Sequence, residues 1–210
     1  MLPVKQIAFW ADELRDISAL GLKFSDDTYD RERFQKIQKI AIAMLAFTSN
    51  SSIHQLEPLQ IPHFSRPCPL VGGDAAVIDS TGRILLIQRA DNMMWAMPGG
   101  LIEVGETPVE GVLREVIEET GYRCQAVSVV GIFDSRFCGT TYPLHLYHFM
   151  FLCTPLAEED QIVPTHQEES LNIKWFHESN LPKNIDPGHI SRIPEAYRVW
   201  RGDNRAFFDQ

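Results

Sequence analysis

The chain has 210 residues, of which 44% are apolar and 22% are charged, a composition that suits a packed core and argues against disorder. Acidic residues outnumber basic ones by 28 to 19, which gives a net charge of -9 and disfavours a broad surface for duplex nucleic acid or an anionic membrane. The longest apolar run in the N-terminal part, residues 40–47, is far too short to span a bilayer. We expect one domain of ordinary size and a small accessory unit.

The cysteines indicate the redox compartment. They form no CxxC pair and no closely spaced framework, which is typical of buried free thiols in a reducing environment. No signal peptide heads the sequence, so the expected location is the cytoplasm. The four cysteines are Cys68, Cys124, Cys138 and Cys153.

Residues 1–50 are predicted to form a helical hairpin. Apolar residues recur at helical spacing over residues 5–20, where the first helix should end near Gly21, and a second helix should begin with Asp30 as its N-cap. Two amphipathic helices joined by a short turn leave apolar faces uncovered. The hairpin should therefore pack on the main domain or on a second subunit, and we expect a homodimer.

Residues 51–68 contain several prolines and are predicted to be a linker, and residues 69–210 are predicted to form the main domain. Two short apolar runs at its start, residues 75–79 and 84–88, are separated by turn formers and predict a strand hairpin. Further strands are expected at residues 126–133, 144–152 and 173–176, and a last helix at residues 191–200. Strands on both sides of a central helix imply an α/β fold with a mixed sheet flanked by helices.

The segment between the second and third predicted strands contains a strongly marked helix. Thr107 is a suitable N-cap, Pro108 suits the first helical position, and Glu110 lies three residues after the cap, as in a capping box. Gly121 is expected to end the helix in a left-handed conformation. The predicted helix therefore covers residues 108–120.

This helix has an apolar face and an acidic face. Its apolar residues recur with the i, i+3, i+4, i+7 pattern of a buried surface, whereas Glu115, Glu118 and Glu119 share another face. Carboxylates at this spacing repel one another in an isolated helix, but they provide the hard oxygen ligands that Mg²⁺ or Mn²⁺ prefers. The pattern indicates either a solvated acidic surface or a divalent metal site.

The spacing around these glutamates favours the metal site. From Gly100 to Tyr122 the sequence follows the pattern G-x5-E-x7-R-E-U-x-E-E-x-G-U, where U is a bulky apolar residue, at every specified position. This pattern resembles the signature of the Nudix hydrolases, and a looser likeness extends over about residues 69–181. The resemblance implies an α/β/α sandwich with a mixed sheet, preceded here by the helical hairpin. It also implies an enzyme that hydrolyses the pyrophosphate bond of a nucleoside diphosphate joined to another group, with Mg²⁺ or Mn²⁺ as cofactor.

The resemblance also assigns the metal ligands. Glu115 and Glu119, one helical turn apart, are the first candidates for metal binding and catalysis. Glu118 is either a third ligand or a carboxylate that contacts the ligands and not the metal ion. In the family, a backbone carbonyl of the preceding glycine turn joins the glutamates, and here Gly100 or Gly99 would supply it.

Four other residues have supporting assignments. Arg114 is expected to pin Glu106 with its two-pronged guanidinium and to hold the loop against the helix, and Glu106 is a candidate for contacting the metal through water. Glu103 would bind a second metal ion next to the substrate, or it is an ordinary surface residue. Arg89 would bind substrate phosphate or form a surface salt bridge.

The general base is expected on a loop before the closing strand, where related hydrolases often place a carboxylate. Glu169 is the first choice for this catalytic role and Glu168 the second, while His166 is either an acid or base or a solvated histidine. Aromatic side chains near the expected sheet edge are candidates either for a nucleobase clamp or for the core. They are Phe133, Phe137, Tyr142 and Tyr147.

The N-terminal region narrows the substrate class. Residues 25–41 are similar to a helical extension found on one bacterial subgroup of the family, whose members act on nucleoside diphosphate derivatives such as ADP-ribose or CDP-choline. The alternatives are a MutT-like nucleoside triphosphate pyrophosphohydrolase and a non-catalytic nucleotide sensor. The sensor has less support, because such domains usually carry a degraded motif and a basic recognition helix.

Overall fold

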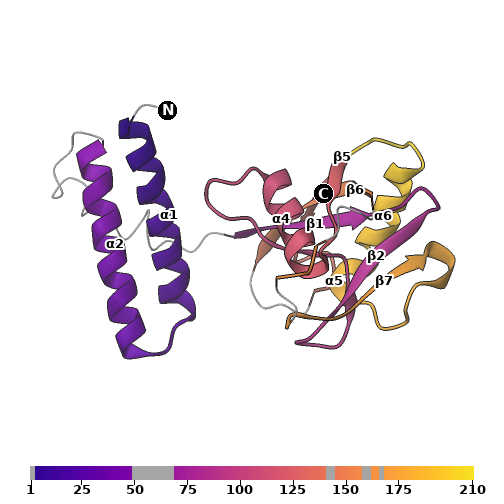
Figure 1. The fold of residues 1–210 in the computed structure, drawn as a ribbon, viewed down its shortest axis with the longest axis horizontal. Coiled ribbons are helices and arrows are strands. Elements are labelled where there is room, and N and C mark those ends of the chain that lie inside the picture. The colour runs from indigo at the N-terminus through magenta and orange to yellow at the C-terminus, as the bar shows by residue number, and fades with distance from the viewer. Residues whose placement is uncertain (1–2, 49–68, 141–144, 158–161, 166–167) are drawn as a thin grey trace. The chain divides into compact units, whose positions relative to one another are not determined.

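The computed structural model describes residues 3–48, 69–140, 145–157, 162–165 and 168–210 (Figure 1). Two compact units can be separated by their contacts, Met1–Cys68 and Pro69–Gln210. The predicted linker, residues 51–68, lies outside the described residues. No described helix is both long and apolar enough to cross a membrane.

The first unit contains two packed helices, which are α1 Pro3–Phe24 and α2 Thr28–Thr48. The predicted end of α1 is wrong, because the helix continues through Gly21. This glycine faces the ring of Phe34, and a Cβ atom added to it would lie 2.4 Å from that ring, so its missing side chain lets the two helices approach. The cap of α2 also differs from the prediction, since Asp27 accepts a hydrogen bond from the Asp30 amide at 2.9 Å.

One face of α1 carries large apolar residues that are about half exposed, and we call this face the α1 stripe. Trp10, Ile17 and Phe24 are 49%, 52% and 54% exposed and follow one another at intervals of seven residues. Seven residues correspond to nearly two full helical turns, so the three side chains lie on the same side of the helix. The hairpin therefore leaves apolar surface uncovered, as the sequence predicts.

The second unit is a mixed α/β domain. Its described strands are β1 Leu70–Val77, β2 Arg83–Arg89, β3 Trp95–Ala96, β4 Gly99–Leu101, β5 Cys124–Asp134, β6 Leu146–Pro155, β7 Ser170–His177 and β8 Phe207–Phe208. Its described helices are α4 Pro108–Thr120, the 3-10 helix η3 Glu178–Asn180, α5 Pro187–Ile190 and α6 Arg192–Trp200. The sequence predicts neither β8 nor α5.

Helix α4 confirms the prediction in its bounds and in its caps. Thr107 and Glu110 form a capping box, with the Thr107 amide donating to Glu110 Oε2 at 2.8 Å. Gly121 ends the helix in the left-handed region at φ 73°, where glycine is favoured because it has no Cβ.

The strands form two sheets. The larger sheet has the order β4-β1-β6-β5-β8, and the smaller one has the order β3-β2-β7. The predicted hairpin of residues 75–79 and 84–88 is wrong, because the two strands belong to different sheets and are joined by an isolated bridge between Ile78 and Ile84. Within the larger sheet, β1 lies between β4 and β6, antiparallel to the first and parallel to the second.

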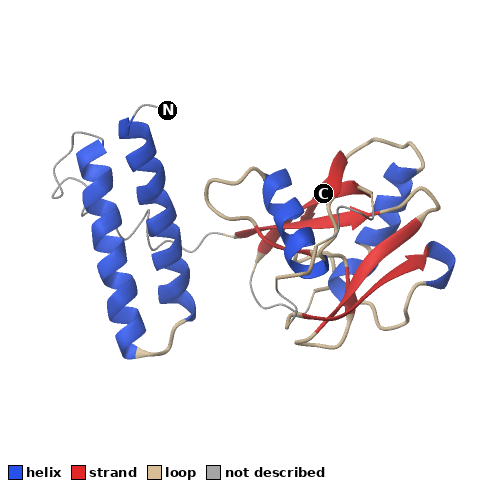
Figure 2. Ribbon diagram, in the orientation of Figure 1, coloured by secondary structure: helices blue, strands red, loops and turns tan. Residues whose placement is uncertain are grey.

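The apolar core lies on both faces of β1. Ala75 and Val77 pack toward α4, and Ala76 and Ile78 pack toward α6, because alternate residues of a strand point to opposite faces. Helices cover both sides of the sheets (Figure 2). The predicted α/β/α architecture with a mixed sheet is confirmed.

The substitution Gly21→Ala tests the close contact between α1 and α2. Alanine normally stabilises a helix by up to about 1 kcal/mol relative to glycine, but here the added methyl group would meet the ring of Phe34. We expect a net loss of about 1–3 kcal/mol in hairpin stability, as overpacking usually causes, measured by thermal unfolding. In a Phe34→Leu background the same substitution should cost less, and an equal cost in both backgrounds would contradict the contact.

Candidate active site

The candidate site is built where β4 meets the acidic face of α4. β4 pairs with β1 in the register that opposes Gly99 to Asp74, and this pairing places the glycine turn beside the glutamates. The Gly99 amide donates a hydrogen bond to Glu119 Oε2 at 2.9 Å. A Cβ atom at Gly100 would lie 2.5 Å from the carboxylate of Glu115, so a larger residue at this position would displace that carboxylate.

Arg114 organises the carboxylates around it. Its guanidinium contacts both oxygens of Glu106, at 2.7 and 3.1 Å, which is the two-pronged contact that the sequence predicts. The same group donates to Glu115 Oε1 and to Glu118 Oε2, each at 2.9 Å, and to the Leu101 carbonyl at 3.0 Å. Hydrogen bonding to Glu106 raises the pKa of Arg114 further above its ordinary value, so its positive charge is permanent.

Two glutamates of α4 are held away from solvent. Glu119 is 7% exposed, and burial raises its pKa to about 8 despite the hydrogen bond from Gly99. The negative charges of Glu115 and Glu169 act in the same direction. Burial also raises the pKa of Glu115, and the neighbouring Arg114 offsets only part of this effect. Near neutral pH, Glu119 therefore favours a bound proton or a bound cation.

The carboxylates line an open cavity of about 940 Å³, which we call the acidic pocket. Glu168 and Glu169 reach it from the segment before β7, where the Glu169 carbonyl accepts a hydrogen bond from the Ala90 amide at 2.9 Å. The structure thus brings together six of the carboxylates that the sequence analysis selects. They are Glu103, Glu115, Glu118, Glu119, Glu168 and Glu169, with Arg89 and Arg114 beside them.

The donors of the acidic pocket fit a hard divalent cation, although the described residues include no group of three or more His, Cys, Asp or Glu already gathered at one point. Arg114 pairs with Glu115 and Glu118, and Glu119 meets a neutral amide. A buried carboxylate with a raised pKa, beside other carboxylates and a glycine turn, has the chemistry that Mg²⁺ or Mn²⁺ selects. To bind such an ion, Glu115 and Glu118 would exchange some of their contacts with Arg114.

Arg89 lies at the junction of the acidic pocket and a second cavity. Its guanidinium forms a two-pronged ion pair with Asp91, at 3.0 and 2.7 Å, and its side chain is 41% exposed. Of the two interpretations offered by the sequence, the structure contains the salt bridge. Because Arg89 borders both cavities, this position is also compatible with a contact to substrate.

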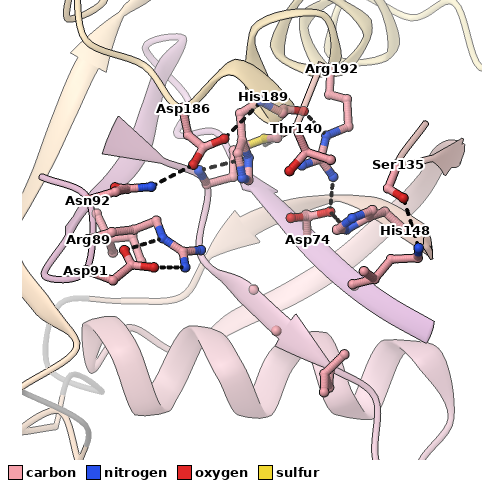
Figure 3. Close-up of a pocket in the computed structure, with 18 residues that line it drawn as sticks. Asp74, Arg89, Asp91, Asn92, Ser135, Thr140, His148, Asp186, His189 and Arg192 are labelled. Carbon is pink, nitrogen blue, oxygen red and sulfur yellow. Dashed lines mark hydrogen bonds and ion pairs between the residues drawn. The ribbon is translucent and has the colours of Figure 1, made fainter. Parts of the chain in front are cut away.

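The second cavity has a volume of about 410 Å³ and contains a buried polar cluster that the sequence analysis does not identify; we call it the polar pocket (Figure 3). The cluster joins Asp74 of β1, His148 of β6 and Arg192 of α6, with His189 of α5 nearby. Arg192 donates to Asp74 and, through Nε, to the Gly188 carbonyl at 2.6 Å. His148 Nδ1 lies 3.0 Å from the same carboxylate.

The environment of this cluster fixes its protonation. Burial of Asp74 is outweighed by the charges of Arg192 and His148, which hold the pKa of the Asp74 carboxyl far below its ordinary value. Burial lowers the pKa of His189 well below 6.5, so this imidazole is neutral at pH 7. Because His189 Nδ1 accepts a hydrogen bond from the Met97 amide at 3.3 Å, its proton belongs on Nε2.

A weak sequence signal for the cluster does exist. Asp74 is a charged residue at the start of an apolar strand segment, and His189 and Arg192 are three residues apart near the last helix. Local patterns do not link these positions to His148, because only the pairing of β1 with β6 brings the histidine to Asp74.

The predicted aromatic clamp does not agree with the structure. Phe133 is 2% exposed and stacks on Phe207 with the ring centroids 4.6 Å apart, so it belongs to the core and not to a substrate site. Phe137 and Tyr147 are more exposed but line neither the acidic nor the polar pocket. The candidates that lie outside the described residues are Tyr142 and His166.

Two family profiles and several known proteins match this chain in sequence. The family profile of the NUDIX domain matches residues 70–196, and that of the UDP-X-like N-terminal oligomerisation domain matches residues 5–59. A Bacillus subtilis (strain 168) protein, provisionally named an ADP-ribose pyrophosphatase, is 28% identical over 95% of both chains. A Methanocaldococcus jannaschii protein named ADP-ribose pyrophosphatase is 41% identical over 63% of this chain and 75% of its own.

Solved structures agree with these matches. The crystal structure of a UDP-X diphosphatase covers 97% of this chain and 99% of its own, with 24% identity and a TM-score of 0.59. That of an ADP-ribose pyrophosphatase from Streptococcus suis 89-1591 covers 68% of this chain and all of its own (100%), with 26% identity and a TM-score of 0.58. Since the NUDIX profile matches more than half of the sequence, the chain belongs to the Nudix family and is a hydrolase of pyrophosphate bonds, within a family that generally uses a divalent metal ion.

Proposed function

We propose that the chain uses Mg²⁺ to cleave the pyrophosphate bond of a nucleoside diphosphate joined to a second group, releasing a nucleoside monophosphate and a phosphorylated product. The observation that carries this proposal is the buried Glu119, with its raised pKa, in an acidic pocket that adjoins a polar pocket along Gly99 and Gly100. A pyrophosphate fits the acidic pocket while one arm of the substrate enters the polar pocket.

ADP-ribose and CDP-choline are the first substrates to test. Two relatives are named as ADP-ribose pyrophosphatases, and a protein of the same fold and two-part organisation is described as a UDP-X diphosphatase. The N-terminal hairpin also resembles the helical extension of enzymes that act on nucleoside diphosphate derivatives, which supports the same substrate class. These substrates share a nucleoside diphosphate esterified to a polar group, and this is the class that we propose.

The acidic pocket supplies the metal ligands in this proposal. Glu115, Glu118 and Glu119 would hold Mg²⁺ together with a backbone carbonyl of Gly100 or Gly99. When bound, a divalent ion neutralises phosphate oxygens and lowers the pKa of coordinated water. The glutamates need a fixed helix for this role, and the contact of Arg114 with the loop before α4 restrains that helix.

Glu169 is our choice for the general base. It lines the acidic pocket, and its charge acts on both Glu115 and Glu119, which requires proximity. By taking a proton from water, Glu169 would promote in-line attack on phosphorus. Glu168, which lines the same pocket, is the second choice.

Arg89 and Glu103 complete the substrate side of the acidic pocket. Arg89 would bind a substrate phosphate by giving up part of its ion pair with Asp91, since phosphate accepts the same two-pronged contact. Glu103 is exposed and lines the pocket, where it would contribute through a second metal.

We propose the cytoplasm as the location of the chain. The described cysteines Cys124, Cys138 and Cys153 are free thiols. Burial raises the pKa of Cys124 to about 12, which makes this thiol unreactive at neutral pH. Free thiols agree with a reducing compartment.

We also propose that the chain is a homodimer formed through its helical hairpin. The family profile of the hairpin is that of an oligomerisation domain, and the α1 stripe presents the uncovered apolar surface that an interface between helices needs.

The substitution Glu119→Gln tests the assignment of the acidic pocket. It preserves the size of the side chain and removes its charge, so we expect turnover with Mg²⁺ to fall by more than about two orders of magnitude while the fold survives. Products from a panel of ADP-ribose, CDP-choline and UDP-glucose should be identified by mass spectrometry. The control is Glu195→Gln, a glutamate paired with Arg198 on α6, and similar rates for both variants would refute the assignment.

The raised pKa of Glu119 predicts that Mg²⁺ binding depends on pH. Because this pKa is about 8 instead of the ordinary 4.5, the metal-free carboxyl is mostly protonated at pH 7, and binding should release close to one proton. The apparent association constant should rise by up to about tenfold per pH unit between pH 5 and pH 8 and level off above it. Calorimetry in buffers of different ionisation enthalpy measures the released proton, and Glu119→Gln should abolish it.

The same pKa fixes the sign of a stability effect. The folded, metal-free chain binds the Glu119 proton more tightly than the unfolded chain, so this group stabilises the fold most below pH 4.5 and loses its contribution as the pH rises through 8. Magnesium should therefore raise the melting temperature more at pH 8 than at pH 5, and equal shifts at both values would contradict the prediction.

The double substitution Trp10→Glu with Ile17→Glu tests the dimer. Two charges on the α1 stripe should prevent a second apolar stripe from packing against it, and light scattering should then give the mass of one chain. Gln35→Glu adds a charge at an exposed position of α2 and should leave the dimer intact. A wild-type chain that is monomeric at all concentrations would refute the proposal.

A further inference from the structure

The polar pocket has hydrogen-bonding groups left over for a ligand. Both contacts to Asp74, from Arg192 and from His148, use the single oxygen Oδ2. Among the described residues, no donor bonds to Asp74 Oδ1 and no acceptor bonds to Arg192 Nη2. Neither atom is among the described side-chain atoms that make no hydrogen bond and are also closed to solvent. Asp74 Oδ1 and Arg192 Nη2 are therefore a spare acceptor and a spare donor that open on the cavity that both residues line.

The charged groups of the polar pocket are already paired with one another. Its carboxylates are Asp74, Asp91 and Asp186, and its guanidiniums are Arg89 and Arg192. Each guanidinium already faces a carboxylate, while Asp186 accepts hydrogen bonds from Asn92 Nδ2 at 3.0 Å and from the Gly188 amide at 2.9 Å. No guanidinium of this pocket is therefore left without a carboxylate to meet a phosphate, and the pocket suits an uncharged arm of the substrate.

The walls of the pocket favour a flat ring over a cationic head group. Apolar side chains of Ile87, Met97, Leu101 and Leu146 line it together with the polar cluster. No Phe, Tyr or Trp lines it among the described residues, and a quaternary ammonium group such as choline is normally bound by an aromatic cage. A planar heterocycle can lie on apolar walls while its polar edge reaches Asp74 and Arg192.

We propose that the polar pocket binds the nucleobase of the substrate, and that Asp74 and Arg192 read its edge. Asp74 Oδ1 accepts an N–H of the base, and Arg192 Nη2 donates to the adjacent carbonyl or ring nitrogen. His148 is a positioning residue, since it holds Asp74 by the opposite oxygen. This inference rests on the proposed function, because it needs the pyrophosphate of the same substrate to lie in the acidic pocket, which shares Arg89, Gly99 and Gly100 with the polar pocket.

Base discrimination by the full chain with Mg²⁺ tests the proposal. UDP-, CDP-, ADP- and GDP-glucose share their sugar and pyrophosphate, so differences in kcat/KM among them report on the base alone. We expect wild type to separate the best from the worst base by at least about tenfold. Asp74→Asn should lower kcat/KM for the preferred base by about 10- to 100-fold, as expected for a hydrogen bond to a charged group, and should reduce the spread among the bases.

The chain offers a closely matched control in Asp134→Asn. Asp134 is also buried and is also held by an arginine and a histidine, through Arg136 at 2.6 Å and His145 at 3.2 Å, but it lines neither pocket. This variant should keep the wild-type ranking of bases. An unchanged ranking in folded Asp74→Asn, or an equal loss of discrimination in Asp134→Asn, would overturn the proposal.

A binding measurement separates this proposal from the proposed function. Uridine, cytidine, adenosine and guanosine carry no phosphate, and their titration into wild type labelled with ¹⁵N-histidine should shift the ring signals of His148 and His189. Shifts caused by glucose and by none of the nucleosides would place the second group of the substrate in the pocket and overturn the inference. If wild type cleaves none of the four sugar nucleotides, the cleavage of nucleoside diphosphate sugars fails as a function, and the nucleoside titration alone decides whether the pocket binds bases.

Discussion

The candidate site depends on a short piece of backbone that lies between a strand and a row of carboxylates. A Cβ atom at Gly99 would lie 2.2 Å from the Gly73 carbonyl oxygen of β1, and one at Gly100 would lie 2.5 Å from Glu115 of α4. At Gly99 a side chain would meet backbone, whereas at Gly100 it would displace the carboxylate of Glu115, which Arg114 holds. Sheet pairing on one side and the helix on the other fix the turn, and this fixed turn defines where the two pockets meet.

The electrostatics of the site follow from this crowding. Several glutamates share a small volume, and their repulsion is relieved in two ways. Arg114 pairs with Glu106, Glu115 and Glu118, whereas Glu119, which is buried against the glycine turn, has its pKa raised into the physiological range. In the proposed site, cation binding would therefore be linked to the displacement of a guanidinium contact and to the loss of a proton. Arg114 would then be both a structural clamp and a substitute for the cation when no cation is bound.

The parts of this structure that the sequence predicts are those set by local interactions. The bounds of α4 follow from Thr107, Glu110 and Gly121, which act within one or two turns of the helix. Of the carboxylates of the acidic pocket, Glu115, Glu118 and Glu119 follow from their spacing on that helix, and the others follow from the resemblance to the family. Gly21 shows the limit of this reasoning, because a glycine near the expected end of a helix was interpreted as a stop, although it serves a contact with the second helix.

The parts that the sequence does not predict depend on tertiary pairing. Apolar alternation identifies β1 and β2 as strands, but it does not specify their partners, and they lie in different sheets. Phe133 is one of the aromatic candidates for the substrate site, yet β5 contains register shifts after Ala126 and Val129, and each irregularity changes the face that later residues occupy. The polar pocket unites residues as distant as Asp74 and Arg192, so no local pattern marks it.

The residues that line both cavities constrain how the substrate preference of such an enzyme can evolve. Arg89, Gly99 and Gly100 contact the space assigned to bond cleavage and also the space assigned to recognition. A substitution at these positions would change both bond cleavage and substrate recognition, whereas Asp74 and Arg192 line the polar pocket only. Substitutions at Asp74 and Arg192 can therefore change which substrate is recognised without changing the residues that line the acidic pocket. New substrate preferences are expected to evolve most easily at these two positions.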